Sequence, residues 1–557
     1  MATTTQGTTG SATRRTAPTT TGGRAGATLE EAVERVLGEG TELRQAQRDA
    51  LRGLTAHDTL LVARTGAGKT AVYAIATLLA ARLTVVVSPL IALQRDQERA
   101  LAEAGLRVAS VSSARTAAQQ REALEAAASG GLDVLLLGPE QLQRDVVRAA
   151  LGDADVGLVV VDEAHCVAEW GHDFRPDYLL VGGVVQQLGA PRVLALTATA
   201  STHVRDEIVG RLGMRDARVL VHDADRPNIW LGARYVATQD ERDAVVRDLV
   251  AEEPGAVVVY ARTRAHCEQL AALIAEVRPA SVYHAGLPAA ERARVQDRFL
   301  GGEDQLVVAT SAFGMGVDRP DVRLVVHAGA PATLDQYYQE VGRAGRDEEP
   351  ARGVVVVRAE DHALSRYQRA SGGPRPATLR RVLAALAEEP GDVAALVSRT
   401  GLGRRTVARA VGTLQHVAAV RDDGGRLRLV EGVVVRRVLA DVQEAGERRA
   451  RLETSRVELV RTYTDTTDCR RRLLLELLGE ERRDTCERCD SCEAGTSLTV
   501  SRQRLRSGQQ VEHREFGPGT VSVVEAERVT VLFEDRGYVT LDTQIALDSE
   551  LLTLAAS

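Results

Sequence analysis

Two long stretches of the chain alternate short apolar runs with segments of helical pattern. The apolar runs lie at residues 57–63, 84–90, 133–140, 157–166 and 192–200, and again at 256–264, 281–286, 305–318 and 322–329. Strands buried on both faces read as continuous apolar runs, and their alternation with helices is typical of a parallel α/β fold. We therefore predict two parallel-sheet lobes, over residues 28–215 and 216–370, after a Thr/Gly-rich disordered tail at 1–27.

The pattern changes beyond residue 370. Residues 392–400 and 404–414 predict two helices joined by a Gly-Leu-Gly turn, and 420–429 fits a β-hairpin with Gly424 and Gly425 at its tip. This order predicts a winged-helix domain over 371–435. Residues 431–466 predict paired helices, so that 436–496 forms a helical hairpin with a cysteine-rich module. A polar linker at 497–507 leads to short strands with glycine turns, which predict a small β-barrel at 508–557.

Composition narrows the class of protein. Hydrophobic residues make up 44% of the 557, enough for sizeable cores. No apolar run is long enough to span a bilayer, and the N-terminus lacks a signal-peptide core. Six cysteines in so long a chain indicate a reducing compartment, and we expect a cytoplasmic protein of bacterial type. The net charge is −7, yet residues 374–483 hold 22 Arg against 16 Asp plus Glu, a balance of +6 that suggests contact with nucleic acid.

The one lysine of the chain stands in the string ARTGAGKT, residues 63–70. Its spacing is that of a nucleotide phosphate loop, with Ala63 in place of the first glycine. An apolar strand precedes the string and an apolar helix follows it. Arginine is a planar fork, whereas Lys69 is a compact charge suited to the β and γ phosphates of ATP. A chance glycine-rich turn is the alternative, and the flanking elements favour the phosphate loop.

Charged residues at the ends of later elements suit hydrolysis of a nucleotide. Asp162 and Glu163 follow an apolar strand, at the sheet edge where ligands bind in open α/β sheets. Asp162 is suited to hold Mg²⁺ together with Thr70, and Glu163 to activate water. Arg343 and Arg346 are three residues apart, so they share one helical face and are suited to neutralise phosphate charge.

Four of the six cysteines crowd into a short segment. Cys469, Cys486, Cys489 and Cys492 have the spacing C-x16-C-x2-C-x2-C. Thiolates two apart in a turn, joined by a distant partner, are typical of a structural Zn²⁺ site. Disulfides or an accidental cluster are the alternatives.

The strings LRQAQRDAL, ARTGAGKT, SPLIALQRDQ, DEAHCVAEWGHDFRPDY, LTATA, TSAFGMGVDRPDVR and QEVGRAGRD stand in the order found in superfamily 2 helicases. The long string after Asp162 resembles the RecQ DNA helicases. The resemblance implies two RecA-like lobes, ATP and Mg²⁺ as cofactors, and 3′-to-5′ unwinding of DNA in repair or recombination. It implies a nucleotide site made by Arg44, Gln47, Thr65, Gly66, Ala67, Gly68, Lys69, Thr70, Asp318 and Gln339.

An aromatic segment follows the carboxylates. Aromatic side chains interleaved with arginine suit stacking on unpaired bases, although anchoring of a core is the plainer interpretation. The resemblance implies that this segment senses DNA and signals to the ATP site through His165. The residues concerned are His165, Trp170, His172, Phe174, Arg175 and Tyr178. Relatives usually carry an adenine-stacking aromatic residue near Gly40, which this chain lacks.

The accessory modules extend the expected contacts. The helix at 404–414 would present Arg404, Arg405 and Arg409 to duplex or single-stranded DNA, with docking to a protein as the alternative. The string HREFGPGTV is similar to the C-terminal Tudor-like module of UvrD-type helicases. That likeness implies a protein partner, with RNA polymerase as the first candidate, and a module independent of the motor. The rival to a nucleoid-associated helicase is a DNA-binding recruitment factor that ATP switches without strand separation.

Overall fold

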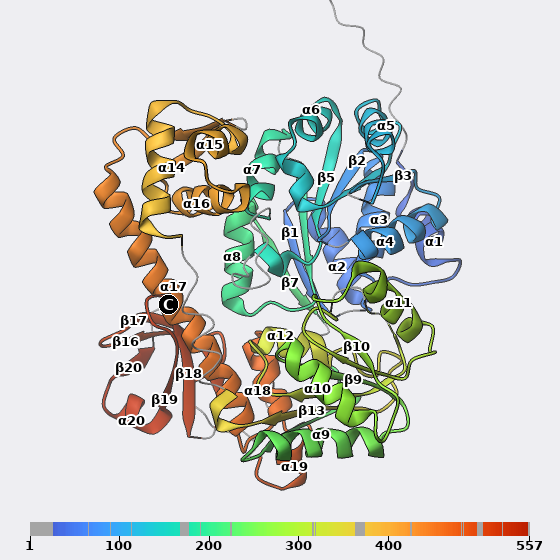
Figure 1. The fold of residues 1–557 in the computed structure, drawn as a ribbon, viewed down its shortest axis with the longest axis vertical. Helices are drawn as coiled ribbons and strands as arrows, with labels where there is room; N and C mark the ends of the chain where they lie inside the picture. The colour runs from blue at the N-terminus through green and yellow to red at the C-terminus, as the bar shows by residue number, and fades with distance from the viewer. Residues whose placement is uncertain are drawn as a thin grey trace, which may run out of the picture.

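The computed structural model describes residues 26–557 apart from 65, 90, 113, 168–177, 190, 223–224, 315–316, 318, 362–373, 424–425, 481, 483, 498–504, 526 and 555–557. Two parallel sheets form the two lobes of a motor (Figure 1). Two helical groups and an antiparallel sheet lie beside them. None of the described helices is long and apolar enough to cross a membrane.

The first lobe is a seven-stranded sheet in the order β3-β4-β2-β5-β6-β1-β7, with every pairing parallel. Central strands such as β2 are buried along their whole length, as a sheet covered on both faces requires. The strands are β1 Thr59–Ala63, β2 Leu83–Val87, β3 Val108–Val111, β4 Val134–Leu137, β5 Val156–Val161, β6 Arg192–Thr197 and β7 Arg218–His222. The helices are α1 Leu29–Leu37, α2 Gln45–Leu54, α3 Lys69–Ala80, α4 Ile91–Glu103, α5 Ala117–Ala128, α6 Asp145–Asp153, α7 Leu179–Gln187 and α8 Thr202–Leu212, with short helices η1 Pro139–Gln143 and η2 Ala164–Val167.

The second lobe is a six-stranded parallel sheet in the order β10-β11-β9-β12-β13-β8. Because β7 pairs with β1, the first sheet extends past the boundary expected at residue 215. The strands are β8 Ile229–Tyr235, β9 Ala256–Ala261, β10 Ser281–Tyr283, β11 Leu306–Ala309, β12 Val322–Ala328 and β13 Ala351–Val357. The helices are α9 Gln239–Glu252, α10 Arg264–Ile274, α11 Ala289–Leu300 and α12 Leu334–Val341.

Three helices and a hairpin follow, packed around a core of their own that includes Leu383, Leu396 and Leu414. The elements are α14 Pro376–Glu388, α15 Val393–Thr400, α16 Arg404–His416, β14 Val420–Asp423 and β15 Arg426–Leu429. The pair β14–β15 is antiparallel. The helix order and the hairpin agree with the pattern from which we predicted this region.

The paired helices predicted over 431–466 are wrong. These residues form one helix, α17 Val435–Asp465, of 31 residues. The segment holds no proline, and its single glycine, Gly446, costs only about 1 kcal/mol at a helix position. Two short helices complete the cysteine-rich region, α18 Arg470–Leu477 and α19 Asp490–Glu493.

The C-terminal residues form a five-stranded sheet in the order β19-β18-β17-β16-β20, antiparallel throughout. Its elements are β16 Gln510–His513, β17 Gly517–Val524, β18 Arg528–Phe533, β19 Gly537–Asp542, α20 Thr543–Asp548 and β20 Leu552–Leu554. Phe516 packs against Phe533, with ring centroids 5.4 Å apart, and stacks on His513, so this ring belongs to the sheet's own core.

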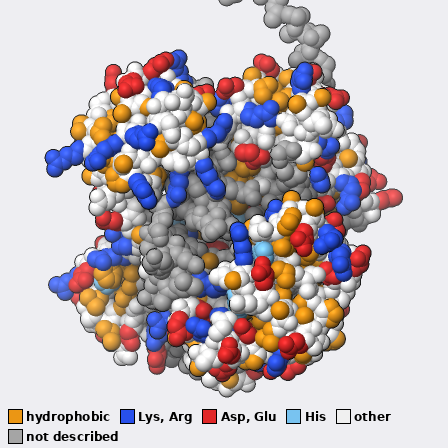
Figure 2. Space-filling model, in the orientation of Figure 1, with side chains coloured by type: hydrophobic (Ala, Val, Ile, Leu, Met, Phe, Trp, Pro, Cys, Tyr) orange, Lys and Arg blue, Asp and Glu red, His pale blue; other side chains and the backbone are white. Residues whose placement is uncertain are grey.

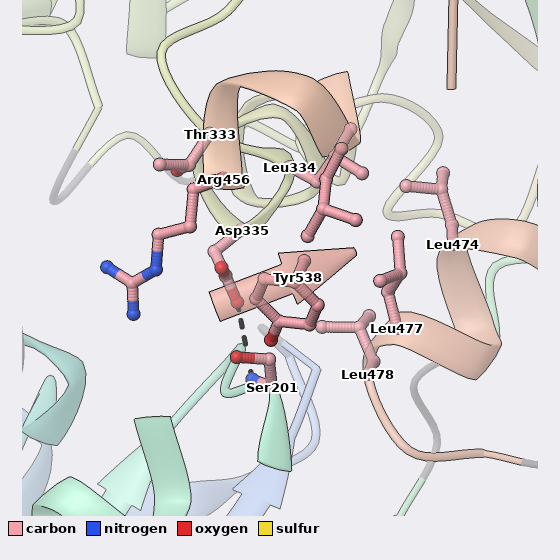
Figure 3. A pocket seen from close by; sticks show the side chains of 10 residues that line it. Ser201, Thr333, Leu334, Asp335, Arg456, Leu474, Leu477, Leu478 and Tyr538 are labelled. Atoms are coloured by element: carbon pink, nitrogen blue, oxygen red, sulfur yellow. Dashed lines mark hydrogen bonds between the residues drawn. The ribbon is translucent and has the colours of Figure 1, made fainter. Parts of the chain in front are cut away.

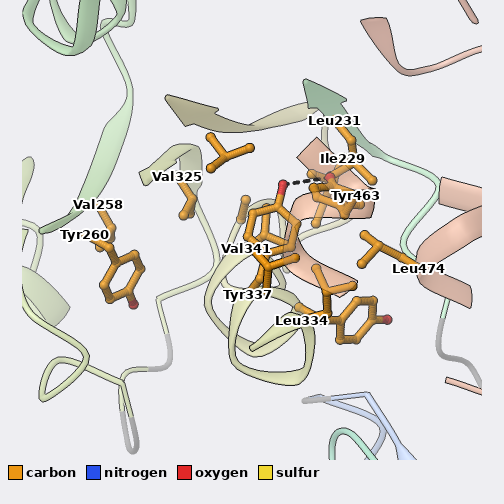
Figure 4. Close-up of a cluster of buried hydrophobic side chains, with 14 of the residues drawn as sticks. Ile229, Leu231, Val258, Tyr260, Val325, Leu334, Tyr337, Val341, Tyr463 and Leu474 are labelled. Atoms are coloured by element: carbon orange, nitrogen blue, oxygen red, sulfur yellow. Dashed lines mark hydrogen bonds between the residues drawn. The ribbon is translucent and has the colours of Figure 1, made fainter. Parts of the chain in front are cut away.

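One hydrophobic cluster joins the second lobe, α17, α18 and the C-terminal sheet (Figure 4). Tyr337 of α12 and Tyr463 of α17 lie at its centre, with ring centroids 4.9 Å apart. The Tyr463 hydroxyl donates to that of Tyr337 at 2.9 Å. Val523 and Tyr538 of the C-terminal sheet belong to the same cluster. The sheet expected to stand apart from the motor is therefore packed against it.

A buried carboxyl at this junction predicts a pH-dependent stability. Glu476 of α18 is 6% exposed and accepts a hydrogen bond from Val524 N at 3.0 Å. Burial raises its pKa from 4.5 to about 8, although the Val524 N–H and Arg472 oppose the shift. The folded state therefore favours the neutral carboxyl of Glu476. The folding stability gained from this preference is complete below pH 4.5 and is lost as the pH rises through 8.

We expect Glu476→Gln to become more stable than the parent protein as the pH rises from about 6 to 9, by roughly 1–3 kcal/mol, because glutamine accepts the same hydrogen bond without a charge. Denaturant midpoints across that range measure the difference. Glu527→Gln, at an exposed site of the same sheet, is the control and should show no pH trend. A constant gap between the Glu476 variant and the parent would mean that Glu476 is ionised throughout.

Candidate active site

The phosphate loop connects β1 to α3 as the sequence predicts. Gly68 is the residue before α3 and has a left-handed φ of 76°. A Cβ at Gly68 would lie 2.4 Å from Nε2 of Gln47, so only glycine fits both the backbone and the space. The N–H groups at the start of α3 form an anion-binding helix terminus. Thr65 lies outside the described residues.

Lys69 lies at the centre of this loop. Its Nζ donates to the carbonyl oxygen of Ala63 at 2.8 Å. Burial lowers the pKa of Lys69, the charges of Glu163 and Asp162 raise it, and that of Arg346 lowers it again. The lysine is thus surrounded by the groups expected to handle phosphate, from both lobes.

Arg44 and Gln47, predicted to contact the base, here support the loop itself. Arg44 Nη1 donates to the carbonyl oxygen of Gly66 at 2.7 Å. Gln47 Nε2 donates to that of Gly68 at 3.2 Å, and its Oε1 accepts from Arg44 N at 2.9 Å. The start of α2 and the loop therefore form one hydrogen-bonded unit, which also includes the buried Ala67.

The two carboxylates lie at the end of β5, beside the phosphate loop. Asp162 is buried, and its Oδ2 accepts from Gln97 Nε2 at 2.7 Å. Burial and the neighbouring Glu163 raise the pKa of Asp162 to about 6, while Lys69 and Gln97 oppose this. Carboxylate oxygens are ligands that Mg²⁺ prefers, so Asp162 is suited to bind this cation. Thr70, the second residue of α3, supplies the hydroxyl expected beside it.

A chain of polar contacts leads from Glu163 to the second lobe. His165 Nδ1 lies 3.4 Å from Glu163 Oε2 and 3.0 Å from the Thr197 hydroxyl. That hydroxyl donates to the carbonyl oxygen of Thr199 at 2.9 Å. Gln339 Nε2 of α12 donates to the Thr199 hydroxyl at 2.6 Å. Gln339, predicted to contact the nucleotide, therefore bridges the lobes.

The two arginines after α12 differ in their surroundings. Arg343 is buried within its own lobe, and its Nη1 donates to the carbonyl oxygen of Val317 at 3.2 Å. Arg346 lies close enough to Lys69 for its charge to lower the pKa of that lysine. The lobes also meet at Arg64 and Glu348, whose side chains are 3.3 Å apart. Asp318 lies outside the described residues.

The aromatic segment is visible only at its end. Trp170, His172, Phe174 and Arg175 lie outside the described residues. Tyr178, predicted with them to contact DNA, is fully buried, and its hydroxyl donates to the carbonyl oxygen of Asp162 at 3.1 Å. Its burial therefore does not favour direct contact with DNA, and its role in coupling to the ATP site stays a prediction. Because the ring is large and apolar, it packs in the core of the first lobe, and its hydroxyl bonds to the residue after β5.

The four late cysteines converge as their spacing predicts. The sulfur atoms of Cys469, Cys486, Cys489 and Cys492 all lie within 4.8 Å of one another, and none is in a disulfide. Cys486 Sγ and Cys492 Sγ are 3.9 Å apart. A tetrahedral zinc site with Zn–S distances of about 2.3 Å has S–S edges of about 3.8 Å. The residues therefore fit a structural Zn²⁺.

This cysteine cluster is attached to the edge strand of the second lobe. Leu231 of β8 pairs with Cys489, and Trp230 Nε1 donates to Glu493 Oε1 at 2.7 Å. Ala233 N donates to Asp490 Oδ2 at 2.9 Å. The module thereby covers the exposed hydrogen-bonding edge of β8.

The excess of arginine in residues 374–483 does not form one basic surface. Arg470, Arg471 and Arg472 are buried, and they pair with Asp490, Asp225 and Asp468 respectively. Of the predicted DNA-contacting arginines, Arg404 and Arg405 at the start of α16 are exposed, whereas Arg409 is half-buried. Arg404 Nη2 lies 3.2 Å from Gln143 Oε1 of the first lobe.

Sequence reasoning missed some residues of the site and of the contact between the lobes. Gln97, which holds Asp162, stands within the string SPLIALQRDQ, so its place in that string was the available signal. Ser201 N donates to Asp335 Oδ1 across the lobes at 3.3 Å. No local pattern marks that contact, because its partners lie 134 residues apart.

We expect Lys69→Arg to lower ATP turnover by a factor of about 100 or more, although the charge is kept, because a planar fork cannot replace the single Nζ contact. Steady-state ATP hydrolysis measures the loss. The reverse exchange, Arg82→Lys at an exposed ion pair with Asp155 in the same lobe, is the control and should leave turnover unchanged. Turnover near that of the parent in Lys69→Arg would show that the site accepts the larger cation.

The purified chain should hold one zinc ion per molecule, and Cys489→Ser should lose it together with stability, since α19 would no longer be fixed beside β8. Metal analysis and thermal unfolding measure both effects. Cys267→Ala, at a buried cysteine of the second lobe, should keep its zinc. Zinc retained in Cys489→Ser, or absent from the parent, would contradict the assignment.

The chain matches three domain families in order. Residues 44–208 match the DEAD/DEAH box helicase family, 241–348 match the helicase conserved C-terminal domain, and 431–493 match the RecQ zinc-binding family. The match at 431–493 contains all four clustered cysteines.

The curated relatives agree. The chain is 30% identical over 453 residues to the ATP-dependent DNA helicase RecQ of Haemophilus influenzae, which covers 81% of this chain and 61% of that protein. It is 35% identical over 328 residues to the probable ATP-dependent DNA helicase RecS of Bacillus subtilis, with 58% and 66% covered.

Among solved structures, the helicase Lhr of Mycobacterium smegmatis bound to single-stranded DNA and AMP-PNP has a TM-score of 0.51 at 22% identity, covering 75% of this chain and 61% of that one, a likeness of fold. The chain spans about half to two thirds of the length of the curated relatives it matches first. In its three matched domains and in these relatives the chain is similar to the RecQ DNA helicases.

Proposed function

We propose that this chain is an ATP-dependent DNA helicase of RecQ type, which couples ATP hydrolysis to 3′-to-5′ translocation and to unwinding of duplex DNA in repair or recombination. One observation carries the proposal. Lys69, Asp162 and Glu163 of the first lobe face the second lobe, and the chain through Thr199 and Gln339 joins Glu163 to α12. Hydrolysis chemistry and lobe closure are thus physically linked.

The side chains divide the work of hydrolysis. The phosphate loop and Lys69 would bind the β and γ phosphates, and Thr70 and Asp162 would hold Mg²⁺, which supplies positive charge beside the phosphates. Glu163 would orient and deprotonate the attacking water. Arg346 is the better placed of the two arginines to neutralise charge at the γ-phosphate, because it lies close enough to Lys69 for its charge to lower the pKa of that lysine. Arg343 would hold the arginine segment in position from within its own lobe.

DNA would lie beside the group of α14, α15 and α16. On the face seen in Figure 2, basic side chains gather over this group, on its side toward the middle of the molecule. We propose that this group acts as a winged helix and contacts DNA phosphates through Arg404 and Arg405, which are exposed. The half-buried Arg409 is less suited to that contact.

The aromatic segment would report on bound DNA. Trp170, His172 and Phe174 would stack on unpaired bases. Its described end leads directly to the catalytic groups, since Tyr178 is bonded to the Asp162 carbonyl and His165 touches Glu163. Bases held by the segment could thereby influence hydrolysis. A nucleoid-associated site of action follows if DNA is the substrate.

The rival is a recruitment factor whose DNA affinity ATP switches without strand separation. A Tudor-like C-terminal module with a protein partner, RNA polymerase being the first candidate, would serve either role. That partner stays a prediction from sequence resemblance. One face of the C-terminal sheet is already occupied by α17 and α18, so a partner would have to use the remaining surface.

A strand-displacement assay on duplexes with a 3′ or a 5′ single-stranded tail separates the two functions. We expect ATP-dependent displacement from the 3′-tailed duplex and little from the 5′-tailed one, because translocation begins on the tail. Glu163→Gln, which removes the base while keeping its size, is the inactive control. Hydrolysis and DNA binding without displacement from either duplex would favour the recruitment factor.

A further inference from the structure

The C-terminal sheet is fixed to the helices that carry the cysteine cluster. Its strand β17 lies against α18, where Val524 N donates to Glu476. Arg451 Nε of α17 donates to the carbonyl oxygen of Asp535 at 2.7 Å. The Thr466 hydroxyl donates to Glu525 Oε1 at 2.9 Å. Since α17 and α18 share a hydrophobic cluster with the second lobe, the sheet is bound to that lobe.

One side chain of the sheet reaches the joint between the two lobes. Tyr538 of β19 is 8% exposed and points toward Ser201 of the first lobe (Figure 3). The ring lies beside a small cavity of about 20 Å³. Residues of the first lobe, the second lobe, α17, α18 and the C-terminal sheet line this cavity. They are Ser201, Thr333, Leu334, Asp335, Arg456, Leu459, Leu474, Leu477, Leu478 and Tyr538.

Polar groups of the first lobe lie near Tyr538. Burial raises the pKa of Tyr538, whereas the charge of Arg456 and the Ser201 side chain, toward which the tyrosine points, lower it. Arg205 of α8, also in the first lobe, carries a charge that lowers the Tyr538 pKa further. The Arg205 guanidinium donates through Nε to the carbonyl oxygen of Ala200 at 2.9 Å, so it stiffens the turn before Ser201.

The residues that Tyr538 touches are next to the contacts that link hydrolysis to closure. Ser201 is two residues after Thr199, which accepts the hydrogen bond from Gln339. Ser201 also donates to Asp335, which is one helical turn before Gln339 on α12. A shift of Tyr538 would therefore alter the position of α12 relative to the first lobe.

The two attachments of the sheet differ in strength. Its contact with the second lobe runs through a large apolar cluster, which is costly to open. Its contact with the first lobe consists of a few polar groups around one aromatic ring, and such contacts form and break readily in a motor. The sheet thus travels with the second lobe and meets the first one only when the lobes are together.

We propose that the C-terminal sheet is a closure latch of the motor and that Tyr538 is a positioning residue for ATP hydrolysis, acting through Ser201 and α12. The proposal rests on the ATP hydrolysis proposed above. It differs from the expectation of a module that is dispensable for the motor. Tyr538 touches no reacting group. Its effect must therefore appear in the rate of ATP hydrolysis by the closed state rather than in nucleotide binding.

Full-length Tyr538→Ala should hydrolyse ATP with a kcat about threefold to tenfold lower on single-stranded DNA, with KM for ATP little changed, since only closure is weakened. Tyr538→Phe should show a smaller loss, because it removes the hydroxyl alone. Leu554→Ala, at an exposed position of the same sheet, is the control and should match the parent. Zinc content and thermal unfolding establish that each variant is folded.

A double-mutant cycle makes the test specific. Ser201→Ala and Tyr538→Phe should not be additive in kcat, because the two side chains face each other across the joint. Additive effects, or an unchanged or raised kcat in Tyr538→Ala, would overturn the latch. If Tyr538→Ala is unfolded, the Phe variant and the cycle decide alone. A parent protein without ATP hydrolysis would refute the proposed function, whereas an active parent with an equally active Tyr538→Ala refutes only the latch.

Discussion

The apolar cluster around Tyr337 and Tyr463 determines which parts of this molecule move together. It joins α12 of the second lobe to α17, and through α17 to the cysteine cluster and the C-terminal sheet. A cluster of this kind excludes water from a large area, so its members separate only at a high cost in free energy. The second lobe and the two C-terminal modules therefore form one body. The first lobe meets this body through polar contacts, among them the bond from Gln339 to Thr199.

That division suits an ATP-driven machine. A joint that includes a few hydrogen bonds and the partly exposed ion pair of Arg64 with Glu348 is weak enough to open in each cycle. The groups proposed to bind phosphate are divided across the same joint, since Lys69 belongs to the first lobe and Arg346 to the second. Nucleotide would add contacts to both sides at once, and this is how binding energy can be converted into closure. Tyr538, which belongs to the same body as the second lobe, adds a further contact with the first lobe at this joint.

Local patterns predicted the parts of the site whose chemistry depends on short spacing. The phosphate loop, the carboxylates after β5 and the four cysteines all lie where the sequence indicated, and the two parallel sheets follow the apolar runs. Burial of polar side chains was not predictable in the same way. Arg470, Arg471 and Arg472 count toward the basic balance of residues 374–483, yet all three are buried, and Arg470 and Arg471 pair with carboxylates 20 and 246 positions away. The C-terminal sheet looked independent because its contacts with the motor join residues more than 40 positions apart.

A comparison of a buried arginine with Lys69 explains why this one position holds a lysine. Arg226 shows what a buried arginine needs, since its fork donates to the carbonyl oxygens of Gly342, Ala344 and Gly345 at 2.7–2.8 Å. Lys69 has one close acceptor, the carbonyl oxygen of Ala63 at 2.8 Å, with that of Arg64 at 3.5 Å. An arginine at this position would bring five hydrogen-bond donors to a place that offers about one close acceptor. It would also bring its larger cation toward Arg346. A site for phosphate between two lobes needs one charge on a thin stem, whereas carbonyl groups surround the fork of a buried arginine such as Arg226.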